Sequence, residues 1–385
     1  MKVLIDYTVF DIQTHGGISR CFSELYSHMP PNVSATIGVL ETNNVYLQNL
    51  GFHRKGYLYR HFLTQTNFLG KRALFKFSYN AAHRNYKTFD RWPSVNRDYC
   101  IQLLKEKACD VFHPSFYTKY FLKYLERTPF VLTVHDMIPE LFPQYFPRND
   151  YQIEMKKLLI PQAAHIVAVS ERTKQDIIDL MKVPADKITV VYHGTDESAY
   201  IPRTKMPFPY ILYVGDRNLY KNFGLFFREC VPVLLAHQEL RVVCTGMPFS
   251  PEEQYMFRIC GMSNRFVHRW VLTDQILLDL YHNALVFVYP SAYEGFGIPI
   301  LEAYKAGCPV MLNRASCFPE IAGDAAIYFH MDERGSDFAE KFEELCRLTD
   351  TERTALINRQ KERLKRFSWQ HAAAQLAQVY QKVTQ

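Results

Sequence analysis

The sequence lacks a long hydrophobic run: no apolar stretch approaches the roughly 18–20 residues that a membrane-spanning helix needs. Its start, MKVLIDYTVFD, reaches Asp6 before an apolar region of signal-peptide length can form. The nine cysteines are odd in number and form no C-x-x-C pair. Such a pattern is typical of reduced thiols. We therefore expect a cytoplasmic chain without a membrane span.

Acidic residues are nearly missing from residues 53–91, where Asp90 stands against nine Lys or Arg with aromatic residues between them. The net charge of the whole chain is +6, and this segment accounts for all of that excess, so the remaining residues are close to neutral. This basic segment could be a solvated or acceptor-lining face, a nucleic-acid site or a surface that docks on anionic membrane. We favour membrane docking, peripheral on the inner face of the membrane, and expect no nucleic acid because no nucleic-acid-binding motif accompanies the segment.

The most informative stretch is residues 286–303, VFVYPSAYEGFGIPILEA. Its first residues predict a buried parallel strand, and Pro299 falls where the first turn of a following helix is expected. Backbone N–H groups at such a helix start bind anions, and glycines let a ligand approach closely. Glu294 and Glu302 bracket this site with seven residues between them. Phosphate flanked by hydroxyls, as in a nucleotide sugar, fits this arrangement.

The same stretch resembles the donor site of the retaining glycosyltransferases of family four, which have the GT-B fold. The shared string is E-G-F-G-I-P-I-L-E-A, and A-G-C-P-V and F-P-E-I-A-G-D-A-A follow it. The resemblance implies that Glu294 holds sugar hydroxyls and Glu302 the ribose hydroxyls. It also implies donor contacts from the loop between them, at Gly295, Phe296, Gly297 and Ile298. An Asp-x-Asp motif, which metal-dependent glycosyltransferases use, is missing from the sequence, so we expect no metal and no other cofactor.

The N-terminal half alternates strand and helix patterns, which predicts a parallel sheet covered on both faces. The expected strands are residues 2–9, 32–40, 110–113, 129–136, 165–170 and 188–194.

Two motifs of this half match the family. Gly16 and Gly17 precede a helix pattern; the pair could form only a tight turn, but G-G-I-S-R-x-F resembles a segment that lies over the donor diphosphate. His135 and Asp136 follow a predicted strand, where open α/β sheets bind ligands. They could simply tie down a loop, but T-V-H-D with Pro139 resembles a family motif whose His faces the donor sugar.

The strand pattern restarts after residues 201–209, which contain three prolines and predict a linker. In the family, a Lys six positions after the glycine that ends this strand neutralises the donor diphosphate. Lys221 has that spacing from Gly215. Arg217 departs from the commonest family pattern and could be a surface charge, but we include it among the donor ligands.

We therefore predict an α/β protein of the GT-B fold, with two Rossmann-like domains facing a cleft. The domains are residues 1–200 and 210–366, and residues 367–385 form a helix returning to the N-terminal domain. The resemblance implies transfer of a hexose, with retention, from a nucleotide sugar to a glycan or lipid-linked glycan acceptor. GDP-mannose is the first choice of donor and a UDP-hexose the second, because the motifs resemble those of bacterial surface-polysaccharide mannosyltransferases.

The residues expected to carry the reaction are His135, Lys221 and Glu294. The alternatives are a GT-B sugar-nucleotide epimerase, or a protein that binds sugar nucleotides without catalysis. A phosphorylase would need a cofactor-lysine context that the sequence does not show.

Overall fold

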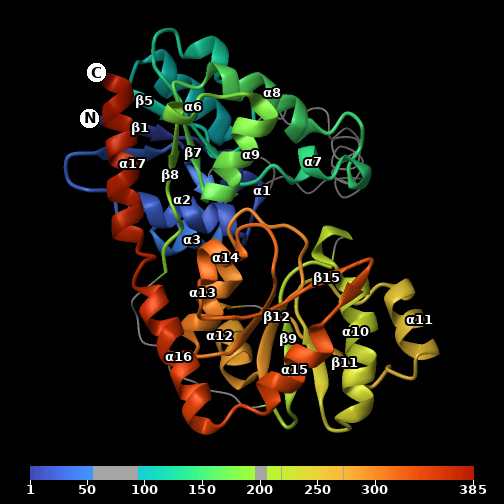
Figure 1. The fold of residues 1–385 in the computed structure, drawn as a ribbon. Helices are drawn as coiled ribbons and strands as arrows, with labels where there is room; N and C mark the ends of the chain where they lie inside the picture. The colour runs from blue at the N-terminus through green and yellow to red at the C-terminus, as the bar shows by residue number, and fades with distance from the viewer. Residues whose placement is uncertain (55–93, 196–205, 218, 272) are drawn as a thin grey trace, which may run out of the picture.

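The computed structural model describes residues 1–54, 94–195, 206–217, 219–271 and 273–385. Most of the basic segment 53–91, and residues 201–205 of the expected linker, lie outside the described residues. Figure 1 shows two lobes, one above the other, with both chain termini on the upper one. We call them the N-terminal lobe and the C-terminal lobe.

The N-terminal lobe contains two three-stranded parallel sheets, joined by a bridge between Phe112 and Phe130. Their strand orders are β2-β1-β5 and β6-β7-β8, where β1 is Lys2–Ile5, β2 Ser34–Ile37, β5 Val111–His113, β6 Val131–Val134, β7 His165–Ala168 and β8 Ile188–Val190. The main helices are α1 (Thr8–Ile12), α2 (Gly17–Ser27), α3 (Val45–Asn49), α6 (Val95–Lys105), α7 (Ile138–Leu141), α8 (Tyr151–Gln162) and α9 (Glu171–Met181), and a short β3–β4 pair (Glu41–Thr42, His53–Arg54) lies apart.

The first predicted strand is too long, because β1 ends at Ile5 and Val9 lies in α1. The carboxylate of Asp6 accepts hydrogen bonds from the backbone N–H and the hydroxyl of Thr8. Such local side-chain bonds compete with a strand and start a turn. The strand expected at residues 188–194 likewise ends early, at Val190.

The C-terminal lobe is built on one six-stranded parallel sheet of order β11-β10-β9-β12-β13-β14. Its strands are β9 (Tyr210–Tyr213), β10 (Arg241–Cys244), β11 (Phe266–His268), β12 (Val286–Tyr289), β13 (Val310–Asn313) and β14 (Ile327–Phe329). The helices are α10 (Phe223–Ala236), α11 (Pro251–Ile259), α12 (Asp274–Asn283), α13 (Ile298–Lys305), α14 (Phe318–Ala322), α15 (Phe338–Cys346) and α16 (Asp350–Leu364), and β15 (Met331–Asp332) pairs with β16 (Gly335–Ser336).

Buried side chains form one cluster in the N-terminal lobe and two on the faces of the C-terminal sheet. All four residues of β12 are buried, as expected for a central parallel strand with both faces covered. Burying each large apolar side chain in this way stabilises the folded state by about 1.5–3 kcal/mol relative to leaving it exposed. These clusters hold the strand ends, and the loops that follow them, in fixed positions.

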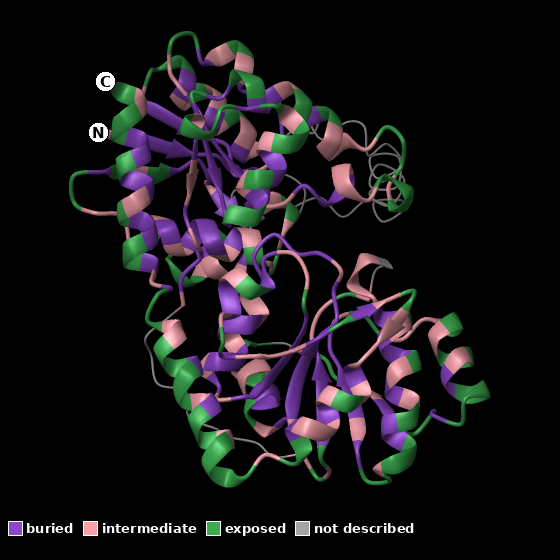
Figure 2. Cartoon of the chain, in the orientation of Figure 1, coloured by how far each residue is buried: buried purple, intermediate pink, exposed green. Residues whose placement is uncertain are grey.

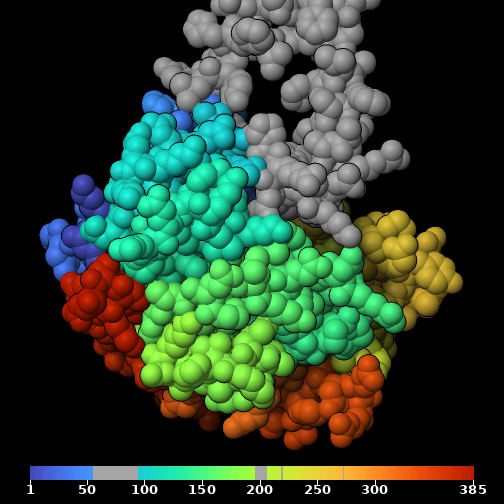
Figure 3. Space-filling model, turned by 90° about the horizontal axis from the view of Figure 1, so that it is seen from above, coloured from blue at the N-terminus to red at the C-terminus, as the bar shows by residue number. Residues whose placement is uncertain are grey.

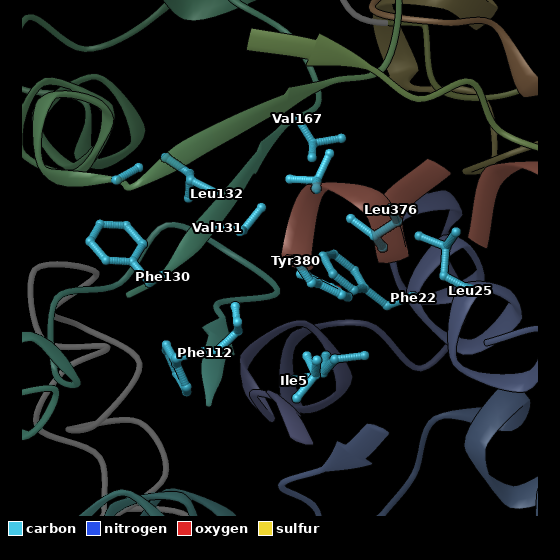
Figure 4. Packing of buried hydrophobic residues seen from close by; sticks show 14 of the residues in the cluster. Ile5, Phe22, Leu25, Phe112, Phe130, Val131, Leu132, Val167, Leu376 and Tyr380 are labelled. Carbon is cyan, nitrogen blue, oxygen red and sulfur yellow. The ribbon is translucent and has the colours of Figure 1, made fainter. Parts of the chain in front are cut away.

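The last helix, α17 (Trp369–Thr384), packs into the core of the N-terminal lobe, although it follows the whole C-terminal lobe in sequence. Leu376 and Tyr380 lie close to Phe22 in Figure 4. The hydroxyl of Tyr380 is 2.6 Å from Nδ1 of the buried His113. The predicted return of the C-terminal helix is therefore confirmed.

The cysteines and the helices also bear on the sequence predictions. All nine cysteines lie in the described residues and are free, and seven of them are buried. Within the same residues, no helix combines the length and hydrophobicity needed to cross a bilayer.

Candidate functional site between the two lobes

The loop between β12 and α13 is the centre of the candidate site. It ends at Gly297, whose φ of 93° is left-handed and whose place is the N-cap of α13. Glycine adopts this conformation without strain. Pro299 lies in the first turn of α13, as predicted. As a glycine, this N-cap offers no side chain to the first N–H groups of α13, and the described first turn contains no acidic residue.

Glu294 in this loop forms an ion pair with Lys221, which ends a short 3-10 turn, η5 (Leu219–Lys221), after β9. Lys221 Nζ lies 2.5 Å from Glu294 Oε1, and both side chains are largely buried. Burial acts to lower the pKa of Lys221, but Glu294, Tyr220 and Asp136 together outweigh it, and the pKa is raised. Lys221 is therefore charged at neutral pH. The N-terminal lobe lies close to this pair, since a Cβ atom on Gly295, the residue after Glu294, would be 3.2 Å from the Cβ atom of Asp136.

His135 and Asp136 follow β6 in the N-terminal lobe, and a buried lysine supports them. Lys156 of α8 donates to the backbone oxygen of Asp136 at 2.8 Å and to Glu140 Oε2 at 3.0 Å. The Lys156 side chain has no exposed surface. A buried ammonium that is fully paired fixes the groups around it, because breaking such a pair is costly.

The His135 ring is neutral, and one of its nitrogens makes no hydrogen bond to the described residues. Burial lowers its pKa to about 3, and His113 and Lys156 act in the same direction. Its backbone N–H donates to the hydroxyl of Tyr117 at 3.1 Å. Its Nε2 is buried without a hydrogen-bond partner among the described residues. An unpaired buried ring nitrogen is a suitable partner for a ligand hydroxyl.

The loop of the C-terminal lobe lies directly on the N-terminal lobe. A Cβ atom on Gly295 would come within 1.8 Å of the backbone oxygen of His135, so the two backbones approach as only glycine allows. Ser170, the N-cap of α9 as predicted, donates from its hydroxyl to the backbone oxygen of Gly295 at 2.6 Å. Phe296 is buried, with its ring 4.6 Å from that of His193.

The glycine pair at the start of α2 lies at the same boundary. A Cβ atom on Gly17 would lie 3.2 Å from Ile298 Cδ1, the first residue of α13. Gly16 is the N-cap of α2 and has an extended backbone. The structure therefore brings the Gly16-Gly17 turn against the first turn of α13. Figure 3, seen from above, shows the green surface that contains α8 and α9 meeting the orange surface of the C-terminal lobe.

Glu302 lies one turn into α13 and contacts both lobes. Arg20 of α2 donates to its Oε1 at 3.1 Å, and the hydroxyl of Tyr281 in α12 donates to its Oε2 at 3.3 Å. Burial raises the pKa of Glu302, and Arg20 counteracts part of that rise.

The partners of Arg217 lie within the C-terminal lobe. Its guanidinium pairs with Glu253 of α11 at 2.6 Å and donates to the backbone oxygens of Thr245 and Met247. The structure therefore gives Arg217 a place in the C-terminal lobe rather than a contact with Lys221. Gly215 precedes it with φ 107°, and its N–H donates to the hydroxyl of Thr245.

Sequence reasoning assigned no site role to Arg20, Lys156 or Tyr281. Arg20 lies within the quoted string G-G-I-S-R-x-F, which was the available signal. Lys156 and Tyr281 belong to ordinary helix patterns and become site residues only through folding. No group of three or more His, Cys, Asp or Glu suited to a metal ion occurs in the part of the chain that the structure describes.

Comparison with known proteins identifies the family of the chain. A family model described as "Glycosyl transferases group 1" matches residues 208–347, and one described as "Glycosyltransferase Family 4" matches residues 72–199. Together they cover more than half of the chain. The chain belongs to the family four glycosyltransferases.

Two relatives of this family four chain are named as O-antigen enzymes. The O-antigen chain mannosyltransferase RfbU of Salmonella typhimurium is 29% identical over 205 residues, 53% of this chain and 58% of that protein. The O-antigen chain mannosyltransferase B of Escherichia coli is 29% identical over 291 residues, 70% of this chain and 74% of that protein. The matched region thus spans little more than half of the first relative and about three quarters of the second.

Solved structures match this chain over almost its whole length. Anabaena Alr3699/HepE, crystallised in complex with UDP-glucose, has a TM-score of 0.70 and 15% identity, with 99% of this chain and 100% of that chain covered. The sucrose-phosphate synthase of Thermosynechococcus elongatus has a TM-score of 0.67 and 15% identity, with 99% and 98% covered. The likeness concerns the fold, and it confirms the predicted two-domain GT-B architecture.

Proposed function

We propose that this chain is a retaining hexosyltransferase that uses a nucleotide sugar. The observation that carries the proposal is the Lys221–Glu294 ion pair, held at 2.5 Å beside the glycine loop of a family four chain. His135 and Asp136 approach the same loop from the opposite lobe. A donor bound there would have a cation, helix N–H groups and hydroxyl-binding carboxylates around it.

In the proposed reaction the bond between the anomeric carbon and the β-phosphate oxygen breaks, and the acceptor hydroxyl forms a new bond to that carbon on the same face. The acceptor proton passes to the departing diphosphate. Lys221 and the α13 N–H groups stabilise the negative charge that develops on the diphosphate. Glu294 and the neutral His135 bind sugar hydroxyls, and Glu302 binds the ribose.

This assignment requires Glu294 to serve two partners. With Lys221 on Oε1, its other carboxylate oxygen remains able to accept from a sugar hydroxyl. Because Lys221 supplies positive charge beside the diphosphate site, we propose that transfer needs no metal ion. Arg217 could bind the diphosphate only if its ion pair with Glu253 broke. We therefore propose that Arg217 supports the site without contacting the diphosphate.

Mannose is the proposed sugar, and a bacterial surface polysaccharide such as O-antigen the proposed product. Both relatives reported above are named as O-antigen chain mannosyltransferases, which supports this choice over a UDP-hexose. The same names favour a transferase over an epimerase or a non-catalytic binding protein.

We further propose a glycan or lipid-linked glycan acceptor and docking of residues 53–91 on anionic membrane. The support is compositional, since nine basic residues stand against one acid there. Each cation near an anionic surface contributes about 1 kcal/mol. Sedimentation with anionic vesicles at low salt, lost when Lys71, Arg72 and Lys76 are replaced by Glu, is the expected result. Equal indifference to anionic and neutral vesicles would end this part of the proposal.

The donor is tested with a panel of GDP- and UDP-sugars, scored for thermal stabilisation of the protein and for slow release of nucleotide. We expect GDP-mannose to give both effects and Glu294→Gln to retain stabilisation by GDP without release. Stabilisation without turnover by any sugar nucleotide, in the presence of acceptor extracts, would favour a binding protein.

A further inference from the structure

We infer that Arg20 is a positioning residue for the donor nucleotide, which it serves by holding the Glu302 carboxylate ionised and oriented from the opposite lobe. The inference rests on the proposed function, because Glu302 is there the ligand of the ribose.

The contact is a buried ion pair between two lobes. Arg20 Nη1 lies 3.1 Å from Glu302 Oε1, and the two side chains are only 16% and 18% exposed. The residues are 282 positions apart in the sequence. An ion pair shielded from water is weakened little by salt, unlike a pair on the surface. Arg20 is thus placed to control the charge of Glu302.

The two donors leave room for a ligand. Arg20 bonds to Oε1, and the Tyr281 hydroxyl bonds to Oε2 at 3.3 Å. An ionised carboxylate has about four acceptor positions, so each oxygen can still accept one hydroxyl. A pair of neighbouring ribose hydroxyls matches the two oxygens. The protein donors therefore aim the carboxylate without using up its capacity.

The surroundings of Glu302 otherwise oppose ionisation. Burial is the largest influence and raises its pKa, and Asp274 of α12 acts in the same direction. Arg20 and the hydrogen bond from Tyr281 lower it. Tyr46 of α3 also faces this group and stays neutral, since its own pKa is raised to about 12. Arg20 is thus the cation among the leading influences on the Glu302 carboxylate.

The Arg20–Glu302 ion pair lies beside a second contact between the two lobes. Arg20 lies three residues after Gly17, the first residue of α2, and Gly17 meets Ile298 at the start of α13. Glu302 lies one turn further along α13. The N-terminal ends of α2 and α13 therefore meet twice, once at Gly17 and Ile298 and once through the Arg20–Glu302 ion pair. This contact between α2 and α13 therefore keeps Glu302 ionised and oriented.

The first test needs no ligand. In Arg20→Met the pKa of Glu302 in the folded protein rises further above its value in the unfolded chain. The folded protein then binds more protons than the unfolded chain between these two values. The free energy of unfolding therefore falls as pH rises through the folded pKa. We expect the melting temperature of Arg20→Met to fall below that of the wild type increasingly from pH 5 to pH 8. In a Glu302→Gln background this pH-dependent difference should vanish. Its persistence there would overturn the ionic link between the two residues.

The second test measures affinity for GDP and UDP from pH 5.5 to 8.5. Both proteins should lose nucleotide affinity as pH falls, because Glu302 becomes protonated. The midpoint of this loss should lie about one pH unit or more higher in Arg20→Met than in the wild type. Arg20→Lys should restore the wild-type profile, and Arg228→Met, which removes an exposed arginine, should not change it. Below its midpoint the Arg20→Met affinity should fall about tenfold per pH unit.

An equal loss of affinity at every pH would show that Arg20 acts only through packing, and would overturn the inference. Failure of the wild type to bind either nucleotide would overturn the proposed function instead. The ligand-free stability comparison keeps these two failures apart.

Discussion

The backbone of Gly295 rests on the carbonyl oxygen of His135, so closely that a Cβ atom on Gly295 would lie 1.8 Å from that oxygen. One residue belongs to the loop between β12 and α13 of the C-terminal lobe, and the other directly follows β6 of the N-terminal lobe. The hydroxyl of Ser170 fixes the same glycine by donating to its carbonyl oxygen. The lobes thus meet through backbone at the residues next to Glu294.

Gly295→Ala should therefore separate the two lobes at the site. The new methyl group meets backbone rather than a flexible side chain, so we expect a stability loss of about 1–3 kcal/mol and a near-complete loss of turnover. Denaturant unfolding and an initial-rate assay measure the two effects. Gly224→Ala, where a Cβ atom meets nothing within 4 Å, serves as the control. Normal turnover in Gly295→Ala would contradict the role of this contact.

The two carboxylates should differ in what they bind. Glu302→Ala removes a charge-assisted contact to the ribose, so nucleotide binding should weaken by about 1.5–3 kcal/mol. Glu294→Ala should leave GDP binding nearly intact and abolish transfer. Calorimetry with GDP, and a rate assay, check both variants. If Glu294→Ala weakened GDP binding as much as Glu302→Ala, the assignment of Glu294 to the sugar would fail.

The charge at the diphosphate is expected to come from Lys221. Lys221→Ala should lower kcat strongly without unfolding the protein, and a chelator should leave the wild-type rate unchanged. Lys221→Arg, which keeps the charge, controls for the lost volume. A large rate loss with chelator that manganese or magnesium restores would show that a metal supplies the charge.

Stability should fall in acid because of buried neutral histidines. Burial lowers the pKa of His113, His135 and His193 to about 3, from the ordinary 6.5. The unfolded chain then binds more protons than the folded one between these values, so stability present above pH 6.5 is lost toward pH 3. Each histidine contributes up to about 1.4 kcal/mol per pH unit.

Replacing one of these histidines should reduce this slope. His193→Asn is the chosen variant, and the exposed His371→Asn is its control. Unfolding free energies measured from pH 7.5 to 5 decide the matter. Equal slopes in all three proteins would show that these rings are protonated without cost.

The sequence predicts well what depends on neighbouring residues. The strand, loop and helix around residues 286–303 follow from a local apolar run, glycines and Pro299, and the structure has them there. Ser170 caps its helix for the same local reason. The GT-B fold was predictable because its motifs are local strings.

Contacts between distant segments were not predictable in the same way. Arg20 and Glu302 are 282 residues apart, and no pattern in either helix indicates the other. The ion pair of Arg217 with Glu253, 36 residues further on, is likewise not indicated by any local pattern. The length of β1 was misjudged because the carboxylate of Asp6 bonds to Thr8 and ends the strand.

The central claim is that the chain transfers a hexose from a nucleotide sugar with retention at the Lys221–Glu294 pair. Proton NMR of GDP-α-mannose with the wild type, begun within minutes of mixing, reports the anomer of the mannose first released to water or acceptor. The α-anomer from the wild type, with no release by Glu294→Gln, is the predicted result. Release of the β-anomer, or equal release by both proteins, would contradict the account.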